Sequence, residues 1–268
     1  MLEAHIRSCG RGLAVVSEDI IRAVYELVLQ EGDTAIDCGA HLGVHTIPMA
    51  RKVMPAGRVI AIEAMPDFVK RIQTTATAER LTNIEYVEAA LWDTPGESKF
   101  YVVGSHPARS ALKSKNYPEF VDRTSVQEVR VPTVRLDDVC AHAVGVRFVK
   151  LDLEGAEFHA LRGGQGLLVR ERPIVGFENS LALTARGWGY SANDFFGFFA
   201  SIGFSVYSFT GEEITMDMWG SEGGFWNFWA ADRAMDIQPL IATAVENALL
   251  RKRADPSSKA LAAEGERL

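Results

Sequence analysis

The chain has 268 residues, of which 47% are hydrophobic and 24% are charged, and its formal net charge is −7. This composition is typical of a globular protein that buries one large core, and we expect a single domain. The acidic balance argues against nucleic acid as a partner, because proteins that bind nucleic acid usually neutralise its phosphates with clustered Lys and Arg.

Cysteine usage and hydropathy indicate a cytoplasmic protein. Cys9, Cys38 and Cys140 form no CxxC pair and no Cys/His cluster, so neither a disulfide framework nor a zinc site is predicted. No apolar run approaches the roughly 18 residues that a membrane span needs. The N-terminus lacks the apolar centre of a signal peptide. We therefore expect no membrane partner.

The N-terminal half begins with a helical segment, 1–31, in which a helix is expected over 17–31 with Ser17 as its N-cap and Gly32 as its stop. Its buried face would consist of Ile20, Ile21, Val24, Leu27 and Val28. Strands and helices then alternate: strand 34–38, a helix to about Met54, strand 58–63, a helix opened by Pro66, and strand 84–91. This alternation predicts βαβ units and therefore a parallel sheet.

The alternation breaks at residues 96–135, where two segments of period two flank a Ser-rich and basic loop, which predicts an inserted hairpin. Further elements follow at 146–155 (strand), 157–170 (helix), 173–179 (strand), 191–202 (helix), 204–209 and 224–232 (strands), and 237–250 (helix). Strands joined by a short connection are normally antiparallel, so the last one should be reversed. We expect one domain over 1–250 and a flexible polar tail over 251–268.

Residues 37–46, DCGAHLGVHT, connect the first strand to the following helix. A dinucleotide fingerprint needs Gly-x-Gly-x-x-Gly, but counting from Gly39 the other glycine positions hold His41 and Val44. A Walker phosphate-binding motif is absent as well. What remains is a glycine turn before a helix N-terminus, whose free N–H groups favour a small anion such as a carboxylate. S-adenosylmethionine presents such a carboxylate and has no phosphate.

Glu63 ends the second strand, twenty residues beyond Gly43. A carboxylate at this place can accept both hydrogen bonds of a ribose diol. The alternative interpretation is that Gly39 and Gly43 only permit close packing of strand and helix, and that Glu63 is a solvated strand end.

Several blocks make the chain from about Gly32 to Asn179 resemble the FkbM family of S-adenosylmethionine-dependent methyltransferases. They are DCGAHLGVHT, the end of the Glu63 strand, AAL at 89–91, VKLDLEGAEFHALRGG and RPIVGFEN, of which LDLEGAE is the most specific. The family commonly has Asn where this chain has His41. The resemblance implies an α/β, Rossmann-like class I fold, with a seven-stranded mostly parallel sheet, an antiparallel last strand and helices on both faces. It also implies O-methylation of hydroxyls on sugars, polyketides or related metabolites.

The resemblance also assigns cofactor-binding residues. Asp37, Gly39, Ala40, His41 and Gly43 would shape the pocket for the methionine part of the cofactor, and Thr46 would add a hydroxyl contact. Glu63 would hold the ribose. Ala64 and Met65 lie where adenine packs, and Ala89 and Ala90 would offer backbone groups to its edge.

Methyl transfer from a sulfonium depends mainly on alignment, which can be worth roughly 7–11 kcal/mol, against a factor of about 10²–10⁴ for a general base. The proton of an attacking hydroxyl still needs an acceptor. We expect Asp152, Glu154 and Glu178 as catalytic carboxylates, because they follow two parallel strands at the edge where ligands bind. Asp152 is alternatively a ligand of the cofactor's ammonium, or of a divalent cation such as Mg²⁺ together with Glu178 and Asn179.

Neighbouring polar residues have structural explanations. Glu157 is expected to stabilise the start of a helix, and Lys150, inside an apolar strand, to pair with a nearby acid. His45 and His159 are expected to be packed or surface residues. Asn179, Trp188 and Trp219 are the predicted acceptor-binding residues, the two tryptophans as an aromatic wall in glycine-rich loops.

The sequence thus predicts an S-adenosylmethionine-dependent O-methyltransferase that acts on a small hydroxylated acceptor. Two further functions stay open: an NAD-type oxidoreductase, and a non-catalytic cofactor-binding module that serves a partner protein.

Overall fold

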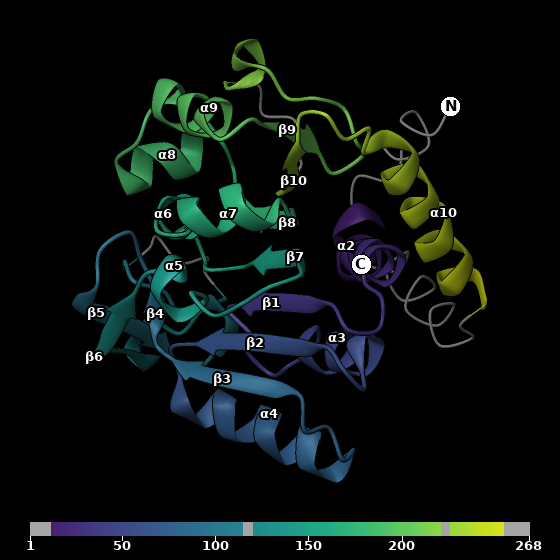
Figure 1. Cartoon of the computed structure of the whole chain (residues 1–268). Coiled ribbons are helices and arrows are strands. Elements are labelled where there is room, and N and C mark those ends of the chain that lie inside the picture. Colours follow the sequence, from purple (N-terminus) through teal and green to yellow (C-terminus); the bar gives the residue numbers. More distant parts are fainter. Residues whose placement is uncertain (1–11, 115–119, 221–225, 255–268) are drawn as a thin grey trace, which may run out of the picture.

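The computed structural model describes residues 12–114, 120–220 and 226–254 (Figure 1). Cys9, residues 115–119 of the insertion, the start of the last predicted strand and residues 255–268 of the predicted tail lie outside these ranges. Within these ranges, no helix combines the length and the apolar character that crossing a bilayer requires.

The central sheet has seven strands in the order β3-β2-β1-β7-β8-β10-β9. Five of them pair in parallel: β1 (Thr34–Cys38), β2 (Arg58–Glu63), β3 (Ile84–Glu88), β7 (Val146–Leu151) and β8 (Ile174–Glu178). β10 (Asn227–Asp232) lies between β8 and β9 (Phe204–Ser208) and runs antiparallel to both. The predicted seven-stranded sheet with a reversed last strand is therefore confirmed.

Helices cover both faces of this sheet (Figure 1). One face carries α2 (Gly12–Val28), α3 (Thr46–Val53), α4 (Pro66–Ala78) and α10 (Gln238–Ala254). The other carries α5 (Leu136–Val139), α6 (Glu157–Arg162), α7 (Gln165–Glu171), α8 (Ala182–Trp188) and α9 (Ala192–Ser201). Alternation along the strands supplies both cores: on β2, Val59 belongs to the core that includes residues of α2, α3 and α10, whereas Ile60 belongs to the core that includes residues of α5 to α9.

The insertion forms a second, three-stranded sheet in the order β4-β6-β5. Its strands are β4 (Ala90–Leu91), β5 (Gly96–Val103) and β6 (Val126–Val134), and the long connection holds the 3₁₀ turns η1 (Pro107–Arg109) and η2 (Arg123–Ser125). β5 and β6 are antiparallel, which confirms the predicted hairpin. The predicted strand 84–91 is in fact two strands, because Ala90 and Leu91 pair with β6 instead of continuing beside β2.

The N-terminal helix differs from its prediction. α2 begins at Gly12, so Ser17 lies inside the helix and is not its N-cap. Leu27, predicted to be buried, is 40% exposed, and Tyr25 is fully buried in its place. The longer helix packs along α10, and this tertiary contact selects the buried face.

Three further helices differ from their predictions. The helix expected over 157–170 is two helices, α6 and α7, which are separated by Gly163 and Gly164. A Cβ atom at Gly163 would lie 2.4 Å from the carbonyl oxygen of Trp92, so this close approach requires glycine. α8 occupies a segment for which the sequence predicts a loop, and α10 continues to Ala254, into the predicted tail. A 3₁₀ turn, η3 (Met216–Met218), precedes Trp219.

Candidate active site

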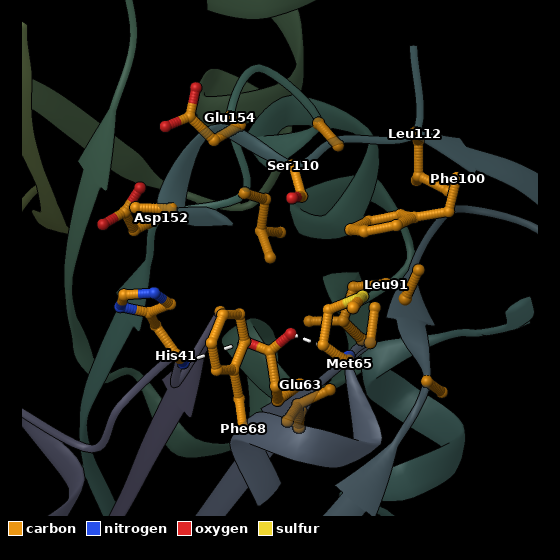
Figure 2. Close-up of a pocket in the computed structure, with 18 of the residues that line it drawn as sticks. His41, Glu63, Met65, Phe68, Leu91, Phe100, Ser110, Leu112, Asp152 and Glu154 are labelled. Atoms are coloured by element: carbon orange, nitrogen blue, oxygen red, sulfur yellow. Dashed lines mark hydrogen bonds between the residues drawn. The ribbon is translucent and has the colours of Figure 1, made fainter. Parts of the chain in front are cut away.

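A cavity opens at the carboxyl edge of the parallel strands, beside the inserted sheet (Figure 2). The space between its lining residues is about 670 Å³, the open solvent at its mouth included. The segments that follow β1, β2, β3 and β7 form its inner wall, and residues of the insertion form its outer wall. The site therefore lies where open parallel sheets normally bind ligands.

The turn after β1 packs against the tips of two neighbouring strands. The N–H groups of Gly39 and Ala40 donate to the carbonyl oxygen of Ile62, over 2.9 and 3.1 Å. Gly39 has φ +77°, and a Cβ atom on it would lie 2.0 Å from the carbonyl oxygen of Asp152. Glycine is thus required at position 39 both for its backbone conformation and for the close approach of the β7 tip.

His41 follows this turn and also has a positive φ, of 47°. Asn and His are among the few residues that tolerate this left-handed conformation, which explains why His stands where the family commonly has Asn. Its ring packs edge-on against Phe68, with centroids 4.3 Å apart. Burial lowers the pKa of His41 below its usual value of 6.5, so the ring is neutral at pH 7.

The Glu63 carboxylate faces this cavity from the end of β2 (Figure 2). One oxygen accepts the N–H of His41 and the other accepts the N–H of Met65, each over 2.8 Å. Burial raises the pKa of Glu63, and these two backbone donors oppose the rise. Each carboxylate oxygen has a second lone pair, so both still have capacity for a diol.

Asp37 and Lys150 form a buried ion pair behind the cavity. The register of β1 and β7 places them side by side, with Lys150 Nζ 3.7 Å from Asp37 Oδ1. Thr46 Oγ1 donates to Asp37 Oδ2 over 2.6 Å. Burial alone would lower the pKa of Lys150, but the carboxylates of Asp152 and Asp37 outweigh it and raise the pKa. Lys150 therefore stays charged, and the predicted pairing with a nearby acid is confirmed.

Three carboxyl groups meet at the tips of β7 and β8. One oxygen each of Asp152, Glu154 and Glu178 lies within 4.8 Å of the others. Burial and the nearby Asp152 raise the pKa of Glu178 to about 9, so Glu178 keeps its proton at neutral pH. Burial opposes ionisation of Asp152 too, but Lys150, 3.4 Å away, and a hydrogen bond with Glu178 lower its pKa. The pair therefore holds one proton, and Asp152 is the ionised member.

Glu157 braces the loop that carries Glu154. Its Oε1 accepts the N–H groups of Leu153 and Gly155, over 2.7 and 3.0 Å, and its side chain is fully buried. Among the described residues, Oε2 has no hydrogen-bond partner. Burial raises the pKa of Glu157 to about 7. This acid lies in the first turn of α6, as predicted, and in addition it is a buried support of the preceding loop.

The predicted cofactor residues separate into two groups. The residues that line the cavity are Gly39, His41, Glu63, Ala64, Met65, Ala89, Ala90 and Asp152. Asp37, Ala40, Gly43 and Thr46 are buried behind it. The hydroxyl of Thr46 is used by Asp37, so the structure gives it a partner other than the predicted one.

Of the predicted catalytic residues, Asp152 and Glu154 line the cavity, and Glu178 adjoins them. The three predicted acceptor residues, Asn179, Trp188 and Trp219, lie outside the set of described residues that line it. Asn179 is buried, donates to Tyr190 Oη and accepts the N–H of Leu181. The residue that joins Asp152 and Glu178 in the cluster is therefore Glu154, and not Asn179 as in the alternative cation site.

The two tryptophans pack against the hydrophobic core, whereas the sequence predicts them on the surface of loops. Trp188 is 8% exposed and ends α8, and the Trp219 ring packs against Phe195 with centroids 5.4 Å apart. His159 is packed as expected: its ring stacks on Trp92 and contacts Asp93 Oδ2 and the carbonyl oxygen of Trp188, each at 3.0 Å. His45 is buried beside Tyr25 and pairs with Glu18.

No residue of the outer wall is among the predicted site residues. The unpredicted residues that line the cavity from the insertion are Phe100, Pro107, Ala108, Ser110 and Leu112. The local sequence gives no signal that a segment following β5 folds over the tips of β2 and β3. Together with Met65 and Phe68 these residues give the cavity the apolar character that an adenine ring requires, so the residues present fit an adenosine cofactor.

Comparisons with known proteins give the family. The model of the methyltransferase FkbM domain matches residues 37–206, well over half of the chain. Carboxy-S-adenosyl-L-methionine synthase of Dichelobacter nodosus is 30% identical over 96 residues, which is 33% of this chain and 40% of that protein. A probable ribosomal RNA small subunit methyltransferase A of Methanosphaera stadtmanae is 40% identical over 60 residues, 22% of this chain and 21% of that protein. The chain thus spans well under half the length of these curated relatives.

Among solved structures, a methyltransferase FkbM from Methylobacillus flagellatus KT superposes with a TM-score of 0.48 and 14% identity, over 75% of this chain and 44% of that one. The family match contains the Gly39 turn, the Glu63 strand end and all three clustered carboxyl groups. The chain belongs to the FkbM methyltransferase family.

Proposed function

We propose that this protein is an S-adenosylmethionine-dependent O-methyltransferase that acts on a hydroxyl group of a small metabolite, such as a sugar, a glycoside or a polyketide-type natural product. The observation that carries the proposal is the carboxyl cluster at the tips of β7 and β8, in which one oxygen each of Asp152, Glu154 and Glu178 lies within 4.8 Å of the others. It adjoins a cavity whose inner wall fits an adenosine that ends in an amino acid.

The cofactor, when bound, supplies a methyl group on a positively charged sulfur. Glu63 would accept the two ribose hydroxyls, and its orientation is fixed in advance by the N–H groups of His41 and Met65. The neutral ring of His41 adds no positive charge beside a cationic ligand. The chain therefore binds and orients, which is the larger contribution in a displacement of this kind.

Asp152 would accept a hydrogen bond from the hydroxyl group of the acceptor. This bond would direct the hydroxyl oxygen towards the methyl group, and Asp152 would then take the proton of the hydroxyl. Lys150 holds Asp152 in the ionised form, and protonated Glu178 donates to it. A carboxylate with a lowered pKa is a weak base, so its contribution belongs near the lower end of the usual factor of about 10²–10⁴.

The charge of the site favours a neutral acceptor. Asp152 and Glu154 line the cavity, and the chain carries a net charge of −7. Phosphate-bearing acceptors would be repelled, whereas hydroxyl groups donate well to carboxylates. This argument bears on RNA in particular, because ribosomal RNA methyltransferases occur among the relatives.

The test is a labelled-methyl assay of the wild-type protein against a panel of glycosides and macrolide-type polyketides, with ribosomal RNA as a further arm. Asp152→Asn should lower kcat about 10²-fold, because the ionised carboxylate is lost. Glu178→Gln should keep most of the activity at pH 7, since a neutral amide replaces a neutral carboxyl. Asp67→Asn, which changes an exposed acid on α4, is the control.

Methylation of RNA alone, or of a nitrogen or carbon atom, would contradict the proposal. Loss of activity in Glu178→Gln with retention in Asp152→Asn would show that Glu178, and not Asp152, accepts the proton. Calorimetry with S-adenosylhomocysteine and with NAD distinguishes a methyltransferase from an oxidoreductase, because binding of NAD alone would favour the oxidoreductase. Cofactor binding with unchanged turnover in both variants would favour a non-catalytic module.

A further inference from the structure

The connection between β5 and β6 turns back along the inserted sheet before Lys113, whose side chain reaches helix α8. Residues Tyr101 and Ala111 exchange backbone hydrogen bonds of 2.8 and 3.2 Å, and Ser110 Oγ accepts the N–H of Val103 over 3.0 Å. Residues Ser110 and Ala111 are therefore fastened to β5 on one side.

The same segment forms part of the cavity wall. Pro107, Ala108, Ser110 and Leu112 line it, and Ser110 and Leu112 lie across the cavity from Glu63 (Figure 2). Leu112 also packs against both the main core and the small cluster around Ala90 and Phe100. A ligand held by Glu63 would thus be covered by this segment.

Lys113 directly follows this wall and reaches α8. Its Nζ donates to the carbonyl oxygen of Gly187 over 3.2 Å and lies 5.0 Å from the centroid of the Trp188 ring. The last carbonyl groups of a helix lack intrahelical partners and favour a cation. The face of an indole ring favours one as well. Both attractions act on the same ammonium group.

The end of α8 is a firm attachment point. A Cβ atom at Gly155 would lie 2.1 Å from Trp188 Nε1, so the indole rests directly on the loop that carries Glu154. The carbonyl oxygen of Trp188 is 3.0 Å from His159 Nε2. Lys113 therefore joins the outer wall of the cavity to the fixed segment behind the carboxyl cluster.

We propose that Lys113 is a positioning residue for the cofactor: by fastening the wall 107–112 to the end of α8, it holds the part of the cavity that faces Glu63 closed over its ligand. The inference rests on the proposed cofactor but not on the identity of the acceptor. Because Lys113 is exposed, water competes for its ammonium group, and the attachment opens readily when a ligand enters or leaves. Its loss should therefore change cofactor binding several-fold rather than abolish it.

The experiment measures binding of S-adenosylhomocysteine and of adenosine to the full chain by calorimetry, and the dissociation rate of S-adenosylhomocysteine by stopped-flow competition. Lys113→Met keeps the apolar stem but removes the charge, and should weaken both ligands by a similar factor of about three to ten, mainly through faster dissociation. Lys113→Arg keeps the cation and should restore binding to within about twofold. Lys99→Met, on β5 of the same inserted sheet, removes an exposed lysine that pairs with Glu128 and should bind as the wild type does.

Three results would overturn the proposal. The first is wild-type affinity and dissociation rate in Lys113→Met. The second is equal weakening in Lys113→Arg, because the cation would then be irrelevant. The third is equal weakening in Lys99→Met, because the effect would then belong to the inserted sheet in general. A wild-type protein that binds neither ligand would instead refute the assigned cofactor, so the two failures are distinguishable.

Discussion

Glu63 shows how one side chain can be prepared for its ligand. Its two oxygens already accept the N–H groups of His41 and Met65, one from each flanking segment. These bonds fix the plane of the carboxylate before any ligand arrives, so little conformational entropy remains to be lost on binding. Each oxygen keeps a second lone pair, which can accept a further hydrogen bond, and the proposed partner is a pair of adjacent hydroxyl groups.

Glu63→Gln should weaken S-adenosylhomocysteine about 10- to 100-fold, because hydrogen bonds to a charged group contribute about 1.5–3 kcal/mol. The amide nitrogen of Gln would also face a backbone N–H that now donates to an oxygen. Calorimetry checks the affinity. The matched control is Glu88→Gln, since Glu88 is the register neighbour of Glu63 on β3 and is exposed.

A ribose analogue makes this prediction specific. The wild-type protein should prefer adenosine over 2′-deoxyadenosine, and Glu63→Gln should lose most of that preference. An unchanged preference in the variant would show that Glu63 does not hold the diol.

At the scale of elements, Arg172 secures the reversed strand. It follows α7 and stacks on Phe204, with its guanidinium carbon 4.7 Å from the ring centroid. Its Nε donates to Asp232 at the end of β10 over 2.7 Å, and its Nη2 donates to the carbonyl oxygen of Gly203 over 3.0 Å. One planar side chain thus ties the start of β8 to the end of β10 and to the turn before β9.

Arg172→Lys should lower the free energy of unfolding by about 2 kcal/mol, because an ammonium group cannot reproduce the fork of donors or the stacking. Urea denaturation provides the measurement. Arg147→Lys, an exposed residue 3.6 Å from Asp33, should change stability by less than about 0.5 kcal/mol. Similar losses in both variants would refute a special role for Arg172.

The elements that the sequence predicts well are those with strong local patterns. β1 and β2 have the predicted bounds, and α9 has the predicted Ser191 cap, which pairs with Asp194 in a capping box. α8 escapes prediction because it is short and contains Gly187, and it is held by burial of Ala185 and Trp188. Helices of this kind depend on tertiary packing, which a local pattern does not contain.

The same distinction applies to the site. Gly39, Glu63 and Asp152 follow strands, and strand order alone brings them to one edge. Phe100, Ser110 and Leu112 come from the insertion, whose fold over the cavity depends on contacts distant in sequence. Likewise the protonation of the Asp152–Glu178 pair depends on burial and on Lys150, which requires three-dimensional structure.

At the scale of the whole molecule, buried acids should make stability depend on pH. The pKa of Glu157 rises from 4.5 to about 7 on folding, because the side chain is buried. An acid with a raised folded pKa holds its proton more tightly in the native state than in the unfolded state. The contribution of Glu157 to the free energy of unfolding is therefore complete below pH 4.5 and is lost as pH rises towards 7.

Glu157→Gln should remove this part of the pH dependence, because the amide is neutral throughout. The difference in unfolding free energy between variant and wild type should shift by about 3 kcal/mol in favour of the variant between pH 4.5 and pH 7. Denaturation curves at both pH values test it. Glu212→Gln, which changes an exposed acid, serves as the control. A constant difference for Glu157→Gln would show that this carboxyl ionises alike in both states.

The pairing of β4 with β6 has a consequence for how this enzyme family can diversify. Ala90 stands opposite Thr133 and Leu91 opposite Val134, so the two ends of the insertion lie side by side. An excursion whose two ends already touch can be lengthened, trimmed or exchanged for another without stretching the scaffold beneath it. An insertion from another protein that preserves those four positions would leave the inner wall of the cavity unchanged and would give it a different outer wall.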